Sequence, residues 1–355
     1  MPGEVRQRGA GARTRPPRAL FIGGSLNQTT QMHAVARELP DFDVRFTPFY
    51  GDLAVDAMRR LGLIEWTIGG DKLRGRCIDY LRDHGLRLDM HGREGAYDLV
   101  VTCTDLVVPD NVRGSRIVVV QEGILDRPGP LTPVCKRLKW LPGWLGGTAL
   151  TGQSNLFDRF CMASEGYKEL FVSQGVDPRK LIVTGIPNFD DCARYLKNDF
   201  PHRGYVLVCT SDARETFKRD DRVALVRRAL DVASGTPLIF KLHPNEDQTR
   251  ASAEIRRLAP GALVYTSGSA EEMIANADVV FTQWSSTAFV ALALGKTVHS
   301  NFPIAELRRL LPQQNGGRSA RRIARVCREV LDSSLPRPNE PGMTPLPLAT
   351  GAVFA

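Results

Sequence analysis

Short apolar runs alternate with helical patterns along most of the chain, and this alternation predicts its fold class. The runs are continuous and rich in β-branched residues, with residues 116–121 as the clearest case. Such runs are typical of parallel strands that helices cover on both faces. The first series of predicted strands covers residues 19–22, 44–46, 98–102, 116–121, 160–163 and 180–184, with helices predicted over 29–39, 52–62, 71–84 and 188–197.

The same pattern starts again after the turn-forming segment 199–204. This second series predicts strands over 205–209, 237–242, 262–265, 278–281 and 297–299, with helices between them that include 221–232, 271–275 and 288–294. We therefore predict an α/β protein of two doubly wound domains, 18–199 and 200–332, between a disordered basic tail (1–17) and a Pro-rich tail (333–355). Ligands of such sheets bind beyond the carboxyl ends of the strands, so the expected site is a cleft between the two domains.

Composition agrees with two cores and argues against a nucleic-acid partner. The chain has 355 residues, of which 43% are hydrophobic, and a single domain typically has roughly 100–200. The net charge of +8 is concentrated at the N-terminus, where residues 1–18 carry five arginines and one acid. The remainder is only mildly basic, so no nucleic-acid partner is expected.

The sequence shows no sign of secretion or of a membrane span. The N-terminus lacks an apolar signal region, and no apolar stretch approaches the roughly 20 residues that a span requires. The seven cysteines are scattered without a CxxC pair, which predicts neither a disulfide framework nor a zinc site. We expect a cytoplasmic protein with reduced thiols and no protein-held metal.

A carboxylate follows the strongest predicted strand of the first domain. Glu122 comes directly after this strand, where partial desolvation raises the pKa of a carboxyl group and suits it to accept a proton from a hydroxyl. Gly123 allows a sharp turn and a close approach of substrate. The alternative is structural, with Glu122 capping a loop or pairing with an arginine.

Two polar segments of the second domain suit a phosphate. Lys241, His243 and Pro244 follow its second strand, where proline holds His243 extended so that the imidazole can donate to a phosphate oxygen and Lys241 can add charge. Ser285, Ser286 and Thr287 precede a helix, and hydroxyls at an open helix N-terminus favour an anion. The alternatives are a loop histidine with its own partners and simple helix capping.

Further polar residues follow the first strand of each domain. Thr210 and Ser211 can reach the same phosphate, and the turn Gly23, Gly24 and Ser25 lies on the acceptor side together with Gly123. The fingerprints GxGxxG, GxxxxGK, HExxH and GxSxG are all absent. These absences argue against a dinucleotide enzyme, a P-loop protein, a zinc protease and a serine hydrolase.

In this order, Glu-Gly, His-Pro and Ser-Ser-Thr resemble motifs of bacterial GT-B transferases that build surface carbohydrates. These transferases include sialyltransferases, Kdo transferases and CDP-glycerol glycerophosphotransferases. The resemblance implies a Rossmann-like GT-B fold with Glu122 as general base. It also implies that His243, Pro244, Ser285 and Ser286 bind the nucleotide.

The chain is also similar to non-hydrolysing UDP-N-acetylglucosamine 2-epimerases, but it departs from them at two places. The His of their His-Arg-x-Glu-Asn stretch corresponds to Ala213, and the Glu that binds the ribose of UDP corresponds to Val290. Both departures argue against an epimerase, and the second weakens a UDP-sugar assignment.

The expected function is therefore an inverting glycosyltransferase of bacterial surface or capsular carbohydrate biosynthesis. Glu122 and His243 act in catalysis, and no cofactor is expected besides the nucleotide sugar as co-substrate. The alternatives are a sugar-nucleotide 2-epimerase and a non-catalytic nucleotide-binding relative. The acceptor is a carbohydrate or a lipid-linked sugar. The segment 136–145, with Trp140 and Trp144, is either a contact with the inner face of the membrane or a helix with a buried apolar face.

Overall fold

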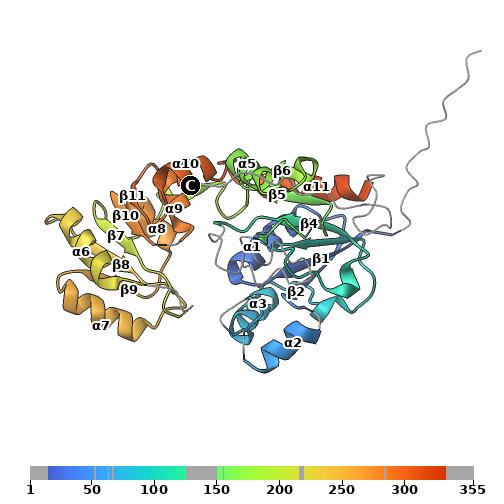
Figure 1. Cartoon of the computed structure of the whole chain (residues 1–355), viewed down its shortest axis with the longest axis horizontal. Coiled ribbons are helices and arrows are strands. Elements are labelled where there is room, and N and C mark those ends of the chain that lie inside the picture. Colours follow the sequence, from blue (N-terminus) through green and yellow to red (C-terminus); the bar gives the residue numbers. More distant parts are fainter. Residues whose placement is uncertain are drawn as a thin grey trace, which may run out of the picture.

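The structure is a computed structural model that describes residues 15–332 except 52, 63, 66–67, 125–149, 155, 216–219 and 284. It contains two parallel sheets with helices packed around them, which confirms the predicted α/β class (Figure 1). The two predicted tails and the segment 136–145 lie outside the described residues, apart from the last residues of the N-terminal tail. No described helix is both long and apolar enough to cross a bilayer.

The first sheet has six parallel strands in the order β2-β1-β3-β4-β5-β6. These strands are β1 (Arg18–Gly23), β2 (Asp43–Pro48), β3 (Leu99–Thr102), β4 (Arg116–Val120), β5 (Arg159–Met162) and β6 (Leu181–Val183). Every residue of β3 is buried, and so are the last four of β4. Burial on both faces explains why these strands read as continuous apolar runs.

The second sheet has five parallel strands in the order β11-β10-β7-β8-β9. They are β7 (Val206–Cys209), β8 (Leu238–Lys241), β9 (Leu263–Tyr265), β10 (Val279–Thr282) and β11 (Thr297–His299). All of the predicted strands of both series are present.

Ten α-helices are described, and most begin at a residue suited to capping. They are α1 (Leu26–Arg37), α2 (Leu53–Arg60), α3 (Asp71–Asp83), α5 (Glu165–Ser173), α6 (Arg222–Ala233), α7 (Gln248–Leu258), α8 (Ala270–Asn276), α9 (Thr287–Ala293), α10 (Ile304–Leu310) and α11 (Ser319–Asp332). Side chains of Ser25, Ser164, Asp221, Asp247 and Ser269 accept hydrogen bonds from the first turns of α1, α5, α6, α7 and α8. Each such cap satisfies an amide that the helix leaves without an internal partner.

The prediction of a helix over residues 188–197 is wrong. Only a 3-10 turn forms there, η6 (Cys192–Leu196). The carbonyl of Asp190 accepts the amides of Asn315 (2.7 Å) and Gly316 (2.8 Å) from a distant part of the chain. These tertiary hydrogen bonds hold the backbone outside a helix.

The last helix among the described residues, α11, packs on the first sheet. It packs against α1, β4 and β5, where its face of Ile323, Cys327 and Val330 is buried. Figure 1 shows α11 beside this sheet, whereas α10 lies by the second one. The expectation that residues 200–332 form one domain is therefore wrong for α11. Its strongly apolar face finds a partner on α1 and β4 rather than on the second sheet.

The chain passes twice between the two sheets, and the two passages lie side by side. We call segments 188–192 and 313–316 the crossing segments. Gln314 joins them, because its Nε2 donates to the carbonyl of Phe189 (2.6 Å) and its Oε1 accepts the amide of Cys192 (3.0 Å). The carboxylate of Asp190 also accepts the amide of Ser319 (2.7 Å), so it caps the start of α11.

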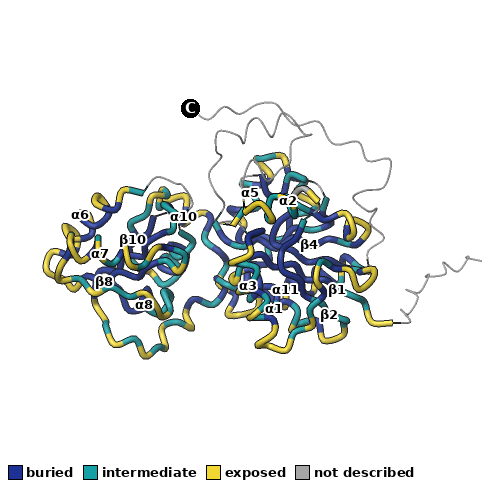
Figure 2. The backbone as a smooth tube through the Cα atoms, turned by 90° about the horizontal axis from the view of Figure 1, so that it is seen from below, coloured by how far each residue is buried: buried dark blue, intermediate teal, exposed yellow. Residues whose placement is uncertain are grey.

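Apolar packing continues from one half of the molecule into the other. Phe289 of α9 lies edge-on to Tyr167 of α5 and to Phe189, with ring centroids 6.3 and 6.2 Å apart. Figure 2 shows buried backbone in the interior of both halves. The six described cysteines are free and buried.

Candidate functional site

Loops at the carboxyl ends of both sheets meet, and we call this meeting place the junction. It is defined by Gly123 after β4, Ser286 after β10, Arg76 of α3 and Asn245 after β8. A β-carbon placed on Gly123 would lie 3.5 Å from Cβ of Ser286. Arg76 Nη1 donates to Asn245 Oδ1 over 3.1 Å. The residue after Glu122 therefore touches the serine segment of the opposite sheet.

The carboxylate of Glu122 is held by the start of α1. It is half-buried, and its two oxygens accept hydrogen bonds from Ser25 Oγ (3.0 Å) and Gln28 Nε2 (2.6 Å). Gln28 Oε1 in turn accepts the amide of Gly24 (2.7 Å). A β-carbon at Gly24 would lie 2.6 Å from Cβ of Ile68, so this turn needs glycine. The carboxylate is fixed by its own half, and each oxygen keeps a lone pair for another donor.

The backbone around Glu122 is also fixed by buried amides. Gln121 donates from Nε2 to the carbonyl of Gly123 (2.9 Å) and accepts the amide of Ala163 (3.0 Å). Gln31 of α1 donates to the carbonyl of Gln121 (3.0 Å). Sequence reasoning missed Gln28, although Ser25-x-x-Gln28 has the spacing of a capping box at the start of a helix.

His243 is held as a neutral imidazole. Its amide donates to Thr210 Oγ1 (3.0 Å), and its Nδ1 accepts the amide of Asn245 (3.3 Å). Burial lowers the pKa of His243, an effect that the charge of Asp212 partly offsets. With Nδ1 as acceptor, the proton lies on Nε2, which leaves Nε2 as a hydrogen-bond donor.

Lys241 does not reach beyond its own loop. Its side chain is buried, and Nζ donates to the carbonyl of Leu242 (2.9 Å). Burial lowers the pKa of Lys241. Pro244, the residue after His243, is exposed. The predicted contribution of Lys241 to a phosphate stays a prediction.

The three hydroxyl residues before α9 differ in their bonding. Ser285 Oγ accepts the amide of Thr287 (3.3 Å) and its hydroxyl (2.9 Å). Ser286 occupies the N-cap position without a side-chain cap bond, and its hydroxyl has no hydrogen-bond partner among the described residues. Of the three, Ser286 is therefore the one that faces Gly123 with a free hydroxyl.

A network that sequence reasoning missed connects the loops of the second sheet. Thr210 donates to Glu246 (2.6 Å), and Ser211 donates to Gln283 (2.7 Å), whose amide donates to Asp220 (2.7 Å). These buried hydroxyls thus have partners within their own half.

Arg222 lies at the centre of this network. It is 2% exposed, bonds Glu246, and lies 3.4 Å from Asp220. It therefore ties together the loops after β7 and β8, and the bond from Gln283 to Asp220 adds the loop after β10. Nε and Nη1 of Arg222 are buried without a partner among the described residues.

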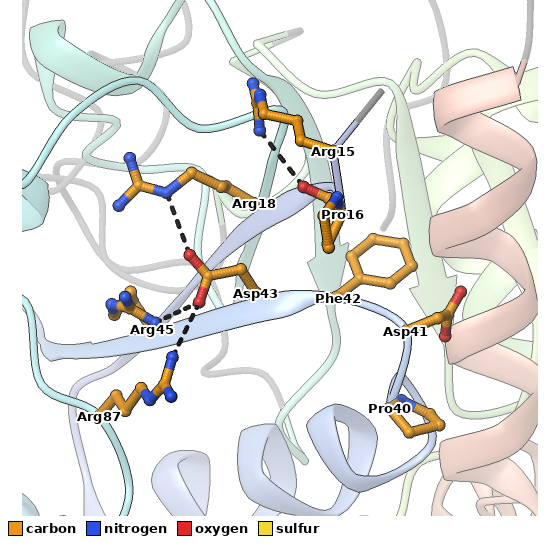
Figure 3. A pocket seen from close by; sticks show the side chains of 9 residues that line it. All are labelled: Arg15, Pro16, Arg18, Pro40, Asp41, Phe42, Asp43, Arg45 and Arg87. Carbon is orange, nitrogen blue, oxygen red and sulfur yellow. Dashed lines mark hydrogen bonds and ion pairs between the residues drawn. The ribbon is translucent and has the colours of Figure 1, made fainter. Parts of the chain in front are cut away.

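An arginine-lined pocket lies at the other edge of the first sheet, at the amino ends of β1 and β2 (Figure 3). Its volume is about 590 Å³, and its lining residues are Arg15, Pro16, Arg18, Pro40, Asp41, Phe42, Asp43, Arg45 and Arg87. The carboxylate of Asp43 forms ion pairs with Arg18 (3.3 Å), Arg87 (3.3 Å) and Arg45. The fourth lining arginine, Arg15, forms an ion pair with Asp98. This edge is opposite to the junction, and its charges already compensate each other.

Two parallel Rossmann-like sheets whose carboxyl-end loops meet define an α/β protein of the GT-B-like fold. No protein-family model and no curated protein matches the sequence. The similarity of this chain to known proteins is therefore a similarity of fold.

Solved structures of nucleotide-sugar enzymes share this fold. UDP-GlcNAc 2-epimerase from Neisseria meningitidis, bound to UDP-GlcNAc, has a TM-score of 0.52 and 13% identity over 87% of this chain and 99% of its own. The 2-epimerase from Rickettsia bellii has a TM-score of 0.52 and 12% identity over 90% and 98%. The wall teichoic acid polymerase TagF has a TM-score of 0.47 and 11% identity over 89% of each chain. At such identities the epimerase structures establish the fold and leave the reaction open.

Proposed function

We propose that this protein is an inverting glycosyltransferase that uses a nucleotide sugar in bacterial surface or capsular carbohydrate biosynthesis. The observation that carries the proposal is the junction. It brings a carboxylate loop of the first sheet, with Glu122, against a hydroxyl loop of the second sheet, with Ser286. A base from one half and a phosphate site from the other are the two parts that transfer from a nucleotide requires.

In the proposed reaction Glu122 accepts the proton of an acceptor hydroxyl. The acceptor oxygen then forms a bond to the anomeric carbon, and the bond from that carbon to the phosphate oxygen breaks from the opposite side. The leaving nucleotide keeps the electron pair. Nε2–H of His243 and the hydroxyl of Ser286 donate hydrogen bonds to its phosphate. Ser25 and Gln28 keep the base in place throughout.

The epimerase alternative rests on the two epimerase structures that share the fold. Two features of this chain argue against it. Val290, at the place of the ribose-binding Glu, is 1% exposed within the core. Arg214, beside Ala213, forms ion pairs with Asp220 (2.9 Å) and Glu254 (2.8 Å). The stretch that corresponds to the epimerase His-Arg-x-Glu-Asn motif therefore stabilises the loop after β7.

Glu122→Gln tests the assigned base. We expect the rate of transfer to fall about 10²- to 10⁴-fold, because general-base catalysis typically contributes that much. The affinity for nucleotide should stay within about twofold, since the partners of Glu122 among the described residues, Ser25 and Gln28, belong to the first half. A panel of UDP, CDP, CMP, GDP and UDP-GlcNAc in a thermal-shift assay identifies the nucleotide, and calorimetry measures its affinity.

The matched control is Glu329→Gln, an exposed carboxylate on α11. It should change neither quantity. Nucleotide binding that weakens in Glu122→Gln while turnover stays constant contradicts the assignment. Conversion of UDP-GlcNAc to its 2-epimer without an acceptor, followed by NMR, supports the epimerase instead.

A further inference from the structure

The proposed phosphate site lies in the second half. Among the described residues of that half, no cation near the site is available to bind a departing phosphate. The described basic residues in or beside its loops after β7, β8 and β10 are Arg214, Arg222, Lys241 and His243. Arg214 and Arg222 are bound to carboxylates, and Lys241 is bound to a carbonyl. His243 is neutral, because burial lowers its pKa. Hydroxyl and imidazole donors alone leave the charge of a diphosphate largely uncompensated.

Arg76 brings a cation to this place from the other half. It lies on α3, where Cys77 and Leu81 face the core and Arg76 is exposed. Its Nη1 donates to Asn245 Oδ1 (3.1 Å), and no carboxylate of the described residues lies within 4 Å of its guanidinium. The backbone N–H of Asn245 donates to Nδ1 of His243 (3.3 Å). Arg76 and the imidazole of His243 therefore both form a hydrogen bond to Asn245, Arg76 to its side chain and the imidazole to its backbone.

Two neighbouring charges strengthen this placement. Asp212 lies 3.7 Å from Nδ1 of His243 and accepts a hydrogen bond from Asn245 Nδ2 (3.4 Å). Its carboxylate therefore lies on the same side of the imidazole as Asn245. Arg74, two residues before Arg76, is turned inward and donates to the carbonyl of Phe49 (3.1 Å). Of these two arginines, Arg76 is therefore the one at the junction.

We propose that Arg76 binds the phosphate of the nucleotide donor across the junction, as the cation that the first half contributes to the site. This inference rests on the proposed function. A guanidinium has five donors in a planar fork that suits phosphate oxygens, and Asn245 uses one of them. Because Arg76 and His243 belong to different halves, a phosphate bound by both also joins the halves.

The test compares four variants of the full chain by calorimetry with UDP and CDP, and by ligand-observed NMR with uridine and cytidine. Arg76→Ala should weaken the diphosphate that binds the wild type at least about tenfold, as expected for a lost charged hydrogen bond. The matching nucleoside, which lacks phosphate, should bind equally well. Arg76→Lys should fall between, because a lysine keeps the charge without the fork. Arg82→Ala, at the exposed end of the same helix, should change nothing.

Asn245→Ala separates phosphate binding from a purely structural contact between the halves. If Arg76 binds phosphate, Asn245→Ala keeps the diphosphate affinity within about threefold. Equal weakening in Arg76→Ala and Asn245→Ala overturns the proposal, because it assigns the effect to their mutual hydrogen bond.

Two further outcomes separate this proposal from the proposed function. Unchanged affinity in Arg76→Ala overturns the role of Arg76 and leaves the transferase proposal standing. It would direct attention to Lys218 and Arg219, which lie outside the described residues. A wild type that binds none of UDP, CDP, CMP, GDP and UDP-GlcNAc overturns both proposals.

Discussion

At the scale of single residues, Arg222 shows how much of the second half depends on one buried cation. Its side chain and those of Asp220 and Glu246 are almost completely buried. A buried carboxylate is tolerated only when an opposite charge and hydrogen bonds compensate it. Glu246 bonds Thr210, and Thr210 bonds the amide of His243, so the position of the imidazole depends on this arginine.

Arg222→Met should therefore destabilise the protein strongly. We expect the free energy of unfolding to fall by about 3–5 kcal/mol, because two carboxylates lose the cation between them. Urea denaturation followed by circular dichroism measures the loss. Arg227→Met, an exposed position on the same helix, is the control and should stay within about 0.5 kcal/mol of the wild type. A loss below about 1 kcal/mol in Arg222→Met would show that the ion pairs of Arg222 with Asp220 and Glu246 are not needed for stability.

At the scale of elements, α11 shows that position in the sequence does not decide which sheet a helix covers. It follows the whole second sheet along the chain, yet it covers α1 and β4 of the first. Ile323 is fully buried there, together with Val326 and Val330. The first sheet therefore becomes complete only when the last described residues of the chain have docked.

Ile323→Ala should weaken the first sheet more than the second. Large-to-small changes in a core cost about 2–5 kcal/mol, since they remove buried surface and leave a cavity. Hydrogen exchange should show amides of β4, such as Val118 and Val119, losing more protection than those of β8. The exposed Arg325→Ala on the same helix is the control. Greater loss of protection in β8 than in β4 would contradict the assignment of α11.

The elements also show where sequence reasoning works. The strands were predictable, because burial on both faces makes each an apolar run that local sequence reveals. The placement of Glu122 and Ser286 in loops that follow strands was predictable as well, since parallel strands bring their carboxyl ends to one edge of each sheet. Their roles in catalysis and binding stay predictions. Arg222 was not predictable, because its partner Glu246 is 24 residues away and no local pattern joins them. Likewise, the amphipathic pattern of α11 indicates a buried face and does not say which sheet buries it.

At the scale of the whole molecule, the pKa values of histidines in both halves are shifted in the same direction. Burial is the largest cause that lowers the pKa of His33, His91, His243 and His299 from the ordinary value of 6.5. Below pH 6.5 the unfolded chain takes up protons at these positions that the folded chain does not bind. Acidification therefore favours unfolding until the pH falls below the pKa values of the folded state.

We expect the free energy of unfolding to decrease between pH 7.5 and pH 5.5. Urea denaturation at pH 7.5, 6.5 and 5.5 measures this slope. His299→Phe should make it shallower, because phenylalanine keeps the stack on Phe281, 4.4 Å away, and removes a titrating group. Carboxyl groups titrate mainly below this range, so they contribute little. A stability that is constant or rises on acidification would contradict the assignment of lowered pKa values to these partly buried histidines.

The paired crossing segments have a consequence for motion. Two bodies joined by one strand of chain can swivel in every direction, whereas a double tether with its strands bonded side by side by Gln314 and Asp190 permits mainly rotation about one axis. Such a hinge rotation moves the carboxyl-end loops of the two sheets toward or away from each other. The second tether exists because α11, the last described helix, packs on the half that contains β1, so the return of α11 fixes the hinge line as well as the first core.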